Sequence, residues 1–410
     1  MNPIKVDSAL QGLLTAAAVR ERCTVIGELA ARGKTRWFRV NESRIRACTD
    51  LVADICRKNY PRLDIPLHSR WRHFTVKGTD LWHHYRASKL EHADDAALIR
   101  SAIDLVFISV LVDAGAGPRW RYTDPVTGSV LTRSEGLAAA SVGLFFNKLS
   151  RDAGSGGRMV DPQILRSLTI EQLARAFQHS ANNPLLGIEG RLQLLRGLAD
   201  ALMLKENSDL SSPGDLFDVF MSGRNNGRLP ADAILREVLR RFGSMWPSGF
   251  VHEGVNLGDC GHHHLLQTGD STSHIVPFHK LSQWLTYSLI EPLRWGGIDV
   301  TDVDGLTGLP EYRNGGLLID TGVIEPVHPA LLSQRLEVDS EAVVEWRALT
   351  VFLLDRIADG VRSRLGKSRD DLPLCSVLQG GTWAAGRQIA GTLRADGSPP
   401  IKLAIDGTVF

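Results

Sequence analysis

Apolar residues recur at helical spacing along most of this chain, and this periodicity limits its possible folds more than any other feature. Between Asp94 and Asp113 the apolar pattern continues for about five helical turns and stops just before Gly115, a typical glycine at a helix C-terminus. Asn41 is a candidate N-cap before another such segment, and Pro213 occupies the first position of a third. Further segments with helical spacing lie at 134–149, 169–178, 189–203, 231–246, 277–293 and 339–366.

Strand signals are few in comparison. Residues 119–133 predict a short hairpin with its turn at 125–128, and residues 401–410 predict another around Asp406-Gly407. We therefore expect a mostly α protein with a few short hairpins. Its 410 residues predict one large helical domain or two tightly packed lobes, with a candidate boundary at the Gly-rich stretch 151–160.

The charge balance argues against a polyanionic partner. Lys and Arg number 47 and Asp and Glu 46, so the net charge of +1 gives no overall electrostatic footprint for nucleic acid or an anionic membrane. The N-terminus lacks a signal-peptide pattern, no apolar run is long enough to span a membrane, and the five cysteines form no CxxC pair. We expect a cytoplasmic protein with reduced thiols that acts on a small molecule, and the sequence leaves its oligomeric state open.

The stretch DAGAGPRW, residues 113–120, resembles a nucleotide-binding turn at first sight. A dinucleotide fingerprint needs a third glycine and a following helix, but Trp120 stands at the third position and the chain has no alternation of strands and helices. The glycines are better explained by a helix end and a turn. Asp113 is the residue in this stretch that we expect at a functional site, facing the same pocket as Glu311.

The segment 302–326 carries the strongest chemical signal. Glu311, Arg313 and Asp320 interrupt apolar residues and glycines, and charged groups in such surroundings are paired or functional. A carboxylate and a guanidinium this close could hold a polyol while the carboxylate activates water. The alternative is a buried Glu-Arg pair that only fixes the turn.

Three shorter clusters offer groups for binding. HSRWRHF, residues 68–74, contains Arg70 and Arg72, which could clamp a phosphate or carboxylate or could simply be solvated arginines on a strand. His279 and Lys280 stand at the start of a helix whose positive end favours an anion. Trp383 and Arg387, one helical turn apart after a Gly-Gly turn, could bind a planar amide or form a structural cation–π pair.

Possible metal ligands gather at 259–264. They are Asp259, Cys260, His262, His263 and His264. Their spacing is poor for zinc, because adjacent histidines point in different directions and no HExxH or CxxC motif is present. We expect a flexible His-rich loop rather than a metal site, and no metal or organic cofactor.

Seven longer motifs extend from about residue 60 to the end of the chain. They are HSRWRHF, DAGAGPRW, NPLLGIEGR, VPFHKLSQWLTYSLIEPL, GLTGLPEYRNGGLLIDTGV, GGTWAAGR and DGTVF. Together they resemble the uracil-catabolism protein family long described as a domain of unknown function. The chain departs from that family at Gln379, where the family has an acidic residue, and at Cys260, where it has an aromatic one. A weaker resemblance links LTGLPEYR to the LT-x-x-ADYR motif of the queuosine-salvage nucleoside-phosphate hydrolases, which have a helical, DNA-glycosylase-like fold.

These resemblances imply an N-ribosyl hydrolase that releases urea from ribosylurea or from its 5′-phosphate. In this hypothesis Glu311, flanked by Tyr312 and Arg313, orients water and opposes positive charge at the sugar. Asp113 and Asp320 hold ribose hydroxyls, or one of them is the base, and His279 donates a proton to the leaving group. The remaining binding candidates are Arg70, Arg72, Lys280, Trp383, Arg387 and Asp259.

Two alternatives from other classes remain open at this stage. A metal-dependent amide hydrolase would attack the ureido carbonyl with the 259–264 cluster and would lose activity with a chelator. A non-catalytic pyrimidine-metabolite-binding protein would bind its ligand tightly without turnover.

Overall fold

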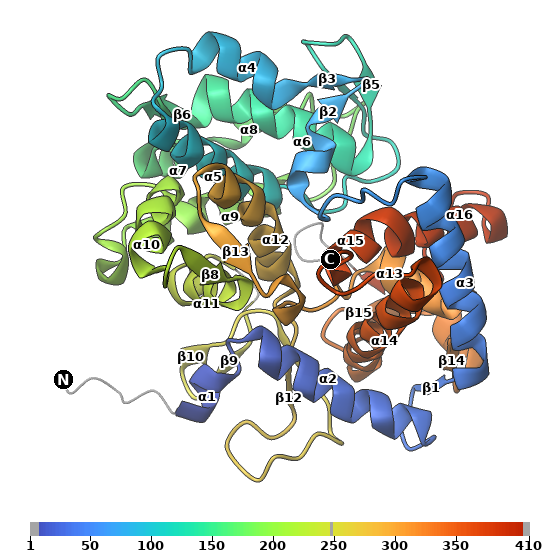
Figure 1. Ribbon diagram of the computed structural model, residues 1–410. Coiled ribbons are helices and arrows are strands. Elements are labelled where there is room, and N and C mark those ends of the chain that lie inside the picture. The colour runs from blue at the N-terminus through green and yellow to red at the C-terminus, as the bar shows by residue number, and fades with distance from the viewer. Residues whose placement is uncertain (1–7, 247–248, 405–410) are drawn as a thin grey trace. The chain divides into compact units, whose positions relative to one another are not determined.

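The structure is a computed structural model that describes residues 8–246 and 249–404. Helices dominate the described residues, and every sheet among them has two strands (Figure 1). The mostly α fold class expected from periodicity is confirmed. In the described part of the chain, no helix is both long and apolar enough to cross a membrane.

The chain divides into two compact units that interleave in sequence. The described residues of the first unit lie at 8–68, 249–283 and 302–404, and those of the second at 69–246 and 284–301. Helix α12 (Lys280–Trp295) therefore contributes its first four residues to the first unit and the rest to the second.

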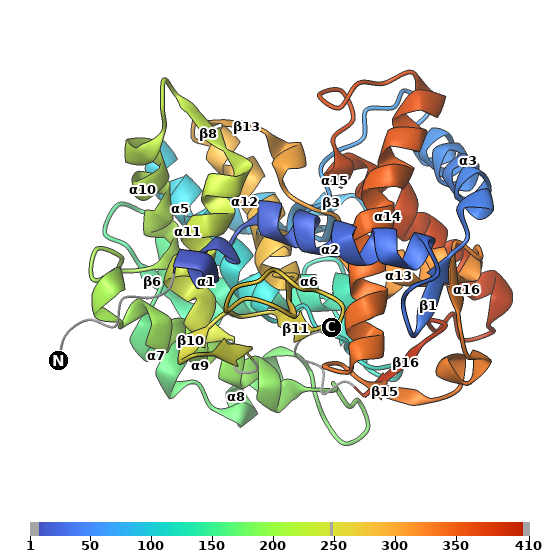
Figure 2. The ribbon, with the colours of Figure 1, turned by 90° about the horizontal axis from the view of Figure 1, so that it is seen from below.

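The first unit is organised around the long helix α14 (Glu341–Leu365), which packs against α2 (Ala16–Ala31) and α3 (Glu42–Asn59) (Figure 2). Glycines permit this close approach: a Cβ at Gly27 of α2 would lie 2.3 Å from the Phe352 ring, and one at Gly360 would lie 2.7 Å from Thr49. The other helices of this unit are α1 (Ser8–Gly12), α13 (Tyr312–Asp320), α15 (Leu374–Val377) and α16 (Trp383–Leu393). Its strand pairs are β1 (Phe38–Val40) with β14 (Ile324–Pro326), β9 (Val251–His252) with β10 (Val255–Asn256), β11 (Cys260–His262) with β12 (Ile275–Pro277), and β15 (Arg335–Glu337) with β16 (Lys402–Ala404).

The second unit surrounds helix α5 (Asp95–Leu111), which is apolar on all sides and almost wholly buried from Ala97 onward. Asp104, a buried carboxyl within it whose pKa burial raises to about 8, accepts hydrogen bonds from the backbone N–H groups of Val160 and Gly214 and so ties two loops to the helix. The other helices are α4 (Leu81–Lys89), α6 (Arg133–Leu144), α7 (Pro162–Ser167), α8 (Ile170–Ala176), α9 (Ile188–Leu202), α10 (Leu216–Gly223) and α11 (Ala231–Phe242), with the short turn η1 (Arg70–His73). The strand pairs are β2 (Thr75–Val76) with β3 (Thr79–Asp80), β4 (Tyr122–Thr123) with β5 (Val130–Leu131), β6 (Ser150–Asp152) with β7 (Arg158–Val160), and β8 (Arg228–Pro230) with β13 (Asp299–Thr301).

Most helix boundaries follow the sequence signals, with one correction. Asn41 is the N-cap of α3, and Pro213 opens the short helical turn before α10. The predicted glycine cap at Gly115 is wrong, because α5 ends at Leu111 with Val112 as its C-cap. The left-handed glycine is Gly117, with φ 82°, where a Cβ would lie 2.8 Å from Leu186.

The predicted hairpin at 119–133 is confirmed as the antiparallel pair β4 and β5. At the C-terminus, β16 instead pairs in parallel with β15, and the predicted turn at 406–407 lies outside the described residues. The Gly-rich stretch 151–159 forms the antiparallel hairpin of β6 and β7 inside the second unit. All five cysteines are free, as expected from their spacing.

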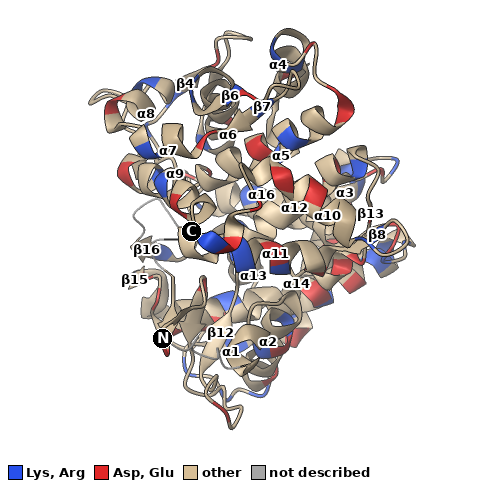
Figure 3. Ribbon diagram, turned by 90° about the vertical axis from the view of Figure 1, so that its left-hand side faces the viewer, with Lys and Arg blue, Asp and Glu red and all other residues tan. Residues whose placement is uncertain are grey.

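Charged side chains are distributed widely over the described elements. In the view of Figure 3, ribbon segments carrying Lys or Arg alternate with segments carrying Asp or Glu.

Candidate active site

Glu311 is held at the start of helix α13 as its N-cap. Its two carboxylate oxygens accept hydrogen bonds of 2.7 Å from the backbone N–H groups of Arg313 and Asn314. Burial raises the pKa of the half-buried Glu311 carboxyl, although these amides and the charges of Lys280 and Arg313 oppose the shift. The raised pKa of Glu311 lies closer to neutral pH than that of an exposed glutamate, which suits a group that exchanges protons with a substrate or water.

The start of α13 is fixed by close packing. A Cβ at Gly315 would lie 2.7 Å from the Trp346 ring of α14, and the Trp346 indole N–H donates to the Gly315 carbonyl at 3.1 Å. The Asn314 side chain donates to the Leu309 carbonyl and accepts from the Thr382 hydroxyl. These contacts fix the start of α13, whose backbone N–H groups hold the Glu311 carboxylate.

Arg313 serves the local structure. Its guanidinium stacks over the Tyr312 ring, 5.1 Å from the centroid, and donates to the Gly397 carbonyl at 2.9 Å. Its backbone is pressed against α16, since a Cβ at Gly386 would lie 2.3 Å from the Arg313 carbonyl oxygen. Arg313 therefore fixes the loop before β16 while its charge acts on Glu311.

Asp259 is another half-buried carboxylate of the first unit, and its pKa is shifted in the opposite direction to that of Glu311. Both of its oxygens accept from Arg347, at 2.8 and 2.7 Å, and one also accepts from the Lys280 backbone N–H at 2.9 Å. Burial favours the neutral form of Asp259, but the charge and hydrogen bonds of Arg347 outweigh it and lower the pKa. Arg347 itself lies over the Phe278 ring at 4.0 Å. The anion expected at the start of α12 is thus the Asp259 side chain.

Lys280 links these two carboxylates. It is the first residue of α12 and is only 8% exposed. Its backbone N–H binds Asp259, whereas its ammonium charge acts on Glu311. The sequence places these residues far apart, and the first unit brings them together.

His279 precedes α12 in a left-handed conformation with φ 48° and is almost fully buried. Its Nε2 lies 2.9 Å from the Leu13 carbonyl oxygen, which can only accept, so Nε2 carries the hydrogen. Burial lowers the pKa of His279, and its Nδ1 has no hydrogen-bond partner among the described residues. At neutral pH this imidazole is therefore suited to accept a hydrogen bond rather than to donate a proton.

Asp320 lies at the opposite end of α13 from Glu311. Nine residues of helix place the two about 13 Å apart along the axis. Both Asp320 oxygens accept from Arg394, at 2.9 and 2.5 Å, and the side chain is buried. In this structure Asp320 anchors α16 rather than joining the Glu311 group.

Trp383 and Arg387 lie on α16, with the guanidinium 5.6 Å from the indole centroid. The expected Gly-Gly turn before them is wrong, because Gly380 and Gly381 belong to a π-helical turn that continues into α16. A Cβ at Gly381 would lie 2.5 Å from Val52 of α3, so these glycines let two helices approach. Trp383 is half-buried and Arg387 is exposed.

Part of the histidine-rich loop meets α14. Ligand atoms of His263, His264 and Glu341 lie within 4.8 Å of one another. Hydrogen bonds already engage them: His264 Nδ1 lies 2.7 Å from Glu341, and His263 Nε2 lies 3.2 Å from the buried Glu345. Among the described residues, the other possible ligands at 259–264, Asp259, Cys260 and His262, are not part of this group.

In the second unit, Asp113 forms an ion pair with Arg70. Arg70 Nη1 lies 2.8 Å from one Asp113 oxygen, and the Ser134 hydroxyl donates to the other at 2.6 Å. Arg70 has no exposed side-chain surface and also donates to Ser109, so the alternative of solvated arginines is wrong for this residue. Burial and the Arg70 charge lower the pKa of His73, beside Ser134, to about 4.

Arg72 points into different surroundings from Arg70. It forms an ion pair with Glu291 of α12, which also accepts a hydrogen bond from the Ser69 hydroxyl. Because residues 70–73 form a short 3₁₀ helix rather than a strand, the side chains of Arg70 and Arg72 diverge. The two arginines therefore do not make one clamp.

Comparison with known proteins places the chain in a family. Residues 12–410 match the family described as "Protein of unknown function (DUF1688)". The chain belongs to this family. It is 35% identical over 409 residues to "Protein urg3" of Schizosaccharomyces pombe, covering 97% of this chain and 98% of that protein. It is also 35% identical over 447 residues to "Uracil catabolism protein 4" of Lachancea kluyveri, covering 99% and 100%.

Sequence reasoning missed two groups that complete these sites. Arg347, the partner of Asp259, could have been found as a charge inside the apolar segment AVVEWRALTVFLL, where an unpaired guanidinium is costly. Ser134, which joins Asp113 and His73, carries no comparable signal, because a serine near a helix start is usually a cap.

Proposed function

We propose that this protein acts in uracil catabolism as an N-ribosyl hydrolase that cleaves ribosylurea, or its 5′-phosphate, to urea and ribose or ribose phosphate. Full-length similarity to a protein named for uracil catabolism supports the pathway. The motif resemblance to nucleoside-phosphate hydrolases supports the bond that is cleaved, and a glycosylase-like fold belongs to the same proposal.

One observation carries the chemistry. The first unit holds two carboxyl groups whose surroundings move their pKa values apart, Glu311 upward and Asp259 downward. Such divergence is how one site keeps a permanent anion beside a group that exchanges protons near neutral pH. Lys280 binds one and acts electrostatically on the other, so all three belong to one constellation.

In the proposed reaction Glu311 in its ionised form accepts a proton from the attacking water. Oxygen of this water bonds to C1′ of the ribose as the bond from C1′ to the ureido nitrogen breaks. The negative charge of Glu311 also opposes the positive charge that develops on the sugar ring. The raised pKa makes Glu311 a stronger base than an exposed glutamate.

The leaving nitrogen receives the bonding electrons and must take up a proton. We assign the donation of this proton to the ammonium group of Lys280, whose charge already acts on Glu311. The neutral, carbonyl-bound His279 suits this role less. Asp259 keeps the start of α12, and with it Lys280, in position through Arg347.

The direct test is to incubate the purified protein with ribosylurea and with its 5′-phosphate and to identify the products by mass spectrometry. Free urea with ribose or ribose phosphate is the expected result, unaffected by a chelator. Ammonia and carbon dioxide with a ribosylamine, lost on chelation, would overturn the proposal in favour of a metal-dependent amide hydrolase that uses the His263, His264 and Glu341 group. Tight binding of either compound without turnover would overturn it in favour of a metabolite-binding protein.

A further inference from the structure

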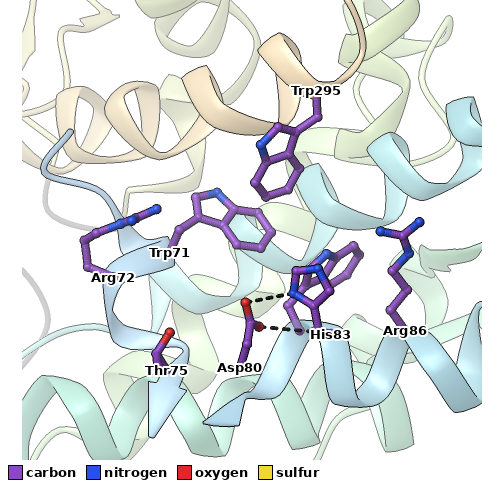
Figure 4. Close-up of a pocket in the computed structure, with 8 residues that line it drawn as sticks. Trp71, Arg72, Thr75, Asp80, His83, Arg86 and Trp295 are labelled. Atoms are coloured by element: carbon purple, nitrogen blue, oxygen red, sulfur yellow. Dashed lines mark hydrogen bonds and ion pairs between the residues drawn. The ribbon is translucent and has the colours of Figure 1, made fainter. Parts of the chain in front are cut away.

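A pocket of about 340 Å³ lies in the second unit, formed by residues that the proposed chemistry does not use (Figure 4). Its walls come from the turn η1, the β2–β3 hairpin, helix α4 and the last residue of α12. The lining residues are Trp71, Arg72, Thr75, Asp80, Trp82, His83, Arg86 and Trp295. This volume is near the lower end of the range for small-molecule sites, roughly 300–1,000 Å³.

Three indoles form the aromatic wall of the pocket. The Trp71 ring meets Trp295 at a centroid distance of 4.6 Å and Trp82 at 5.6 Å, in both cases edge to face. Trp71 and Trp82 are buried, but Trp295 is 50% exposed. An edge-to-face arrangement leaves part of an indole face uncovered, and Trp295 presents that surface at the rim as a platform for a flat ring.

Among the charged side chains that line the pocket, the Arg86 guanidinium is the cation for which the structure describes no ion-pair partner. Arg72 is paired with Glu291, and Asp80 is occupied as the N-cap of α4 and by the His83 ring, 2.8 Å from its carboxylate. Arg86 is exposed and has no hydrogen bond or ion pair through its guanidinium within residues 8–246 and 249–404. Figure 4 shows Arg86 and His83 projecting from α4 and Trp295 projecting from α12.

We propose that this pocket is a second small-molecule site, which binds a planar heteroaromatic ring that carries an anionic group and is about the size of a nucleoside monophosphate. The ring stacks on Trp295, and the phosphate binds the Arg86 guanidinium, whose planar fork matches phosphate oxygens. A cationic ligand fits less well, because the Arg86 guanidinium repels it and the carboxylate of Asp80 already accepts hydrogen bonds from α4. The inference does not depend on the hydrolase proposal.

The test is isothermal titration calorimetry of the full chain with uridine 5′-monophosphate and adenosine 5′-monophosphate, with uridine and inorganic phosphate as separate arms. We expect at least one monophosphate to bind saturably and at least tenfold more tightly than either part alone. Trp295→Ala is expected to weaken this binding roughly tenfold to a hundredfold through loss of stacking. Arg86→Ala is expected to weaken it about tenfold, and Trp295→Phe, which keeps a flat ring, less than Trp295→Ala.

Arg175→Ala is the matched control, because Arg175 is another exposed helical arginine of the same unit. It should bind as the wild type does, and thermal unfolding of each variant confirms that it is folded. Should Trp295→Ala unfold, Arg86→Ala and Trp295→Phe still decide the outcome. Equal binding by wild type and Arg86→Ala, or no binding of either monophosphate at a few millimolar, overturns the proposal.

Discussion

Glu311 and Asp113 are carboxylates at opposite kinds of helix end. Glu311 caps the positive start of α13, where two backbone N–H groups hold it. Asp113 lies just beyond the negative end of α5, where a carboxylate is disfavoured, and there the buried Arg70 guanidinium matches its charge. Burial raises the pKa of Glu311 in spite of these amides, which fix the position of its carboxylate. The Asp113 carboxylate, in contrast, is held in an ion pair with a buried guanidinium. This comparison favours Glu311, in the first unit, as the base of the proposed reaction.

The largest effect is expected from Glu311→Gln. Glutamine keeps one oxygen for a capping hydrogen bond but cannot accept the proton of water, so urea release from ribosylurea should fall by roughly 10³-fold. Stability should fall by only about 1 kcal/mol, the typical contribution of a cap. Stopped assays of urea and chemical denaturation measure the two quantities.

Glu337→Gln is the matched control, since Glu337 is an exposed glutamate of the same unit on β15. It should retain wild-type activity. If the Glu311→Gln protein kept nearly full activity, another residue would be the base, and the contrast between Glu311 and Asp113 would say nothing about catalysis.

The second-largest effect is expected on stability, when the ion pair of Asp113 is broken. Arg70→Met leaves the Asp113 carboxylate without its cation at the end of α5, and we expect a loss of about 3–5 kcal/mol in the free energy of unfolding. Adding Asp113→Asn to Arg70→Met should restore part of this loss, because the unpaired charge is then removed. Urea denaturation of the two variants measures both values. No recovery in the double variant would show that Arg70 acts mainly through packing and its bond to Ser109.

The smallest effect is in the pH dependence of stability. The pKa of Glu311 is raised on folding, so its contribution to stability is complete below its unfolded value and is lost as pH rises through the folded pKa. The pKa of Asp259 is lowered, so its contribution is present above its unfolded value and is lost as pH falls through the folded pKa. Each slope is at most about 1.4 kcal/mol per pH unit.

Unfolding free energies of the wild type, Glu311→Gln and Asp259→Asn between pH 3 and 8 would test these signs. Relative to wild type, the glutamine variant should gain stability as pH rises from about 4.5. The asparagine variant should lose its disadvantage as pH falls below about 3.8. Parallel curves for all three proteins would contradict the opposed pKa shifts.

Sequence periodicity located many of the helices, because packing of a helix against its neighbours gives apolar residues a helical spacing, but it did not locate α2, α4 or α7. It located α5, α12 and α14, and local rules located the Asn41 cap, the Pro213 turn and the β4–β5 hairpin. These features depend on neighbours within a few residues. Glu311 stood out as a charge in apolar surroundings and Lys280 by its place at a helix start, although the bond from Lys280 to Asp259 did not.

The errors occurred where distant segments decide the local structure. Gly115 is not a cap, because the Arg191 guanidinium binds the carbonyls around it, and the left-handed position moves to Gly117. Gly380 and Gly381 serve helix packing against α3 rather than a turn. Strand β16 pairs with β15, whose sequence lies more than sixty residues away. Rules based on neighbouring residues in the sequence cannot identify these distant partners.

Arg191 has a consequence for the order in which the chain folds. From helix α9 it donates to the carbonyls of Val112 and Ala114, 79 and 77 residues earlier, in the place where a helix usually closes with its own backbone. The N–H groups of Val112 and Asp113 close the last turn of α5 locally, but the carbonyls of Val112 and Ala114 accept from Arg191 in a distant helix. We therefore expect the turn after α5 to become ordered when α9 docks and to be released with α9 on unfolding.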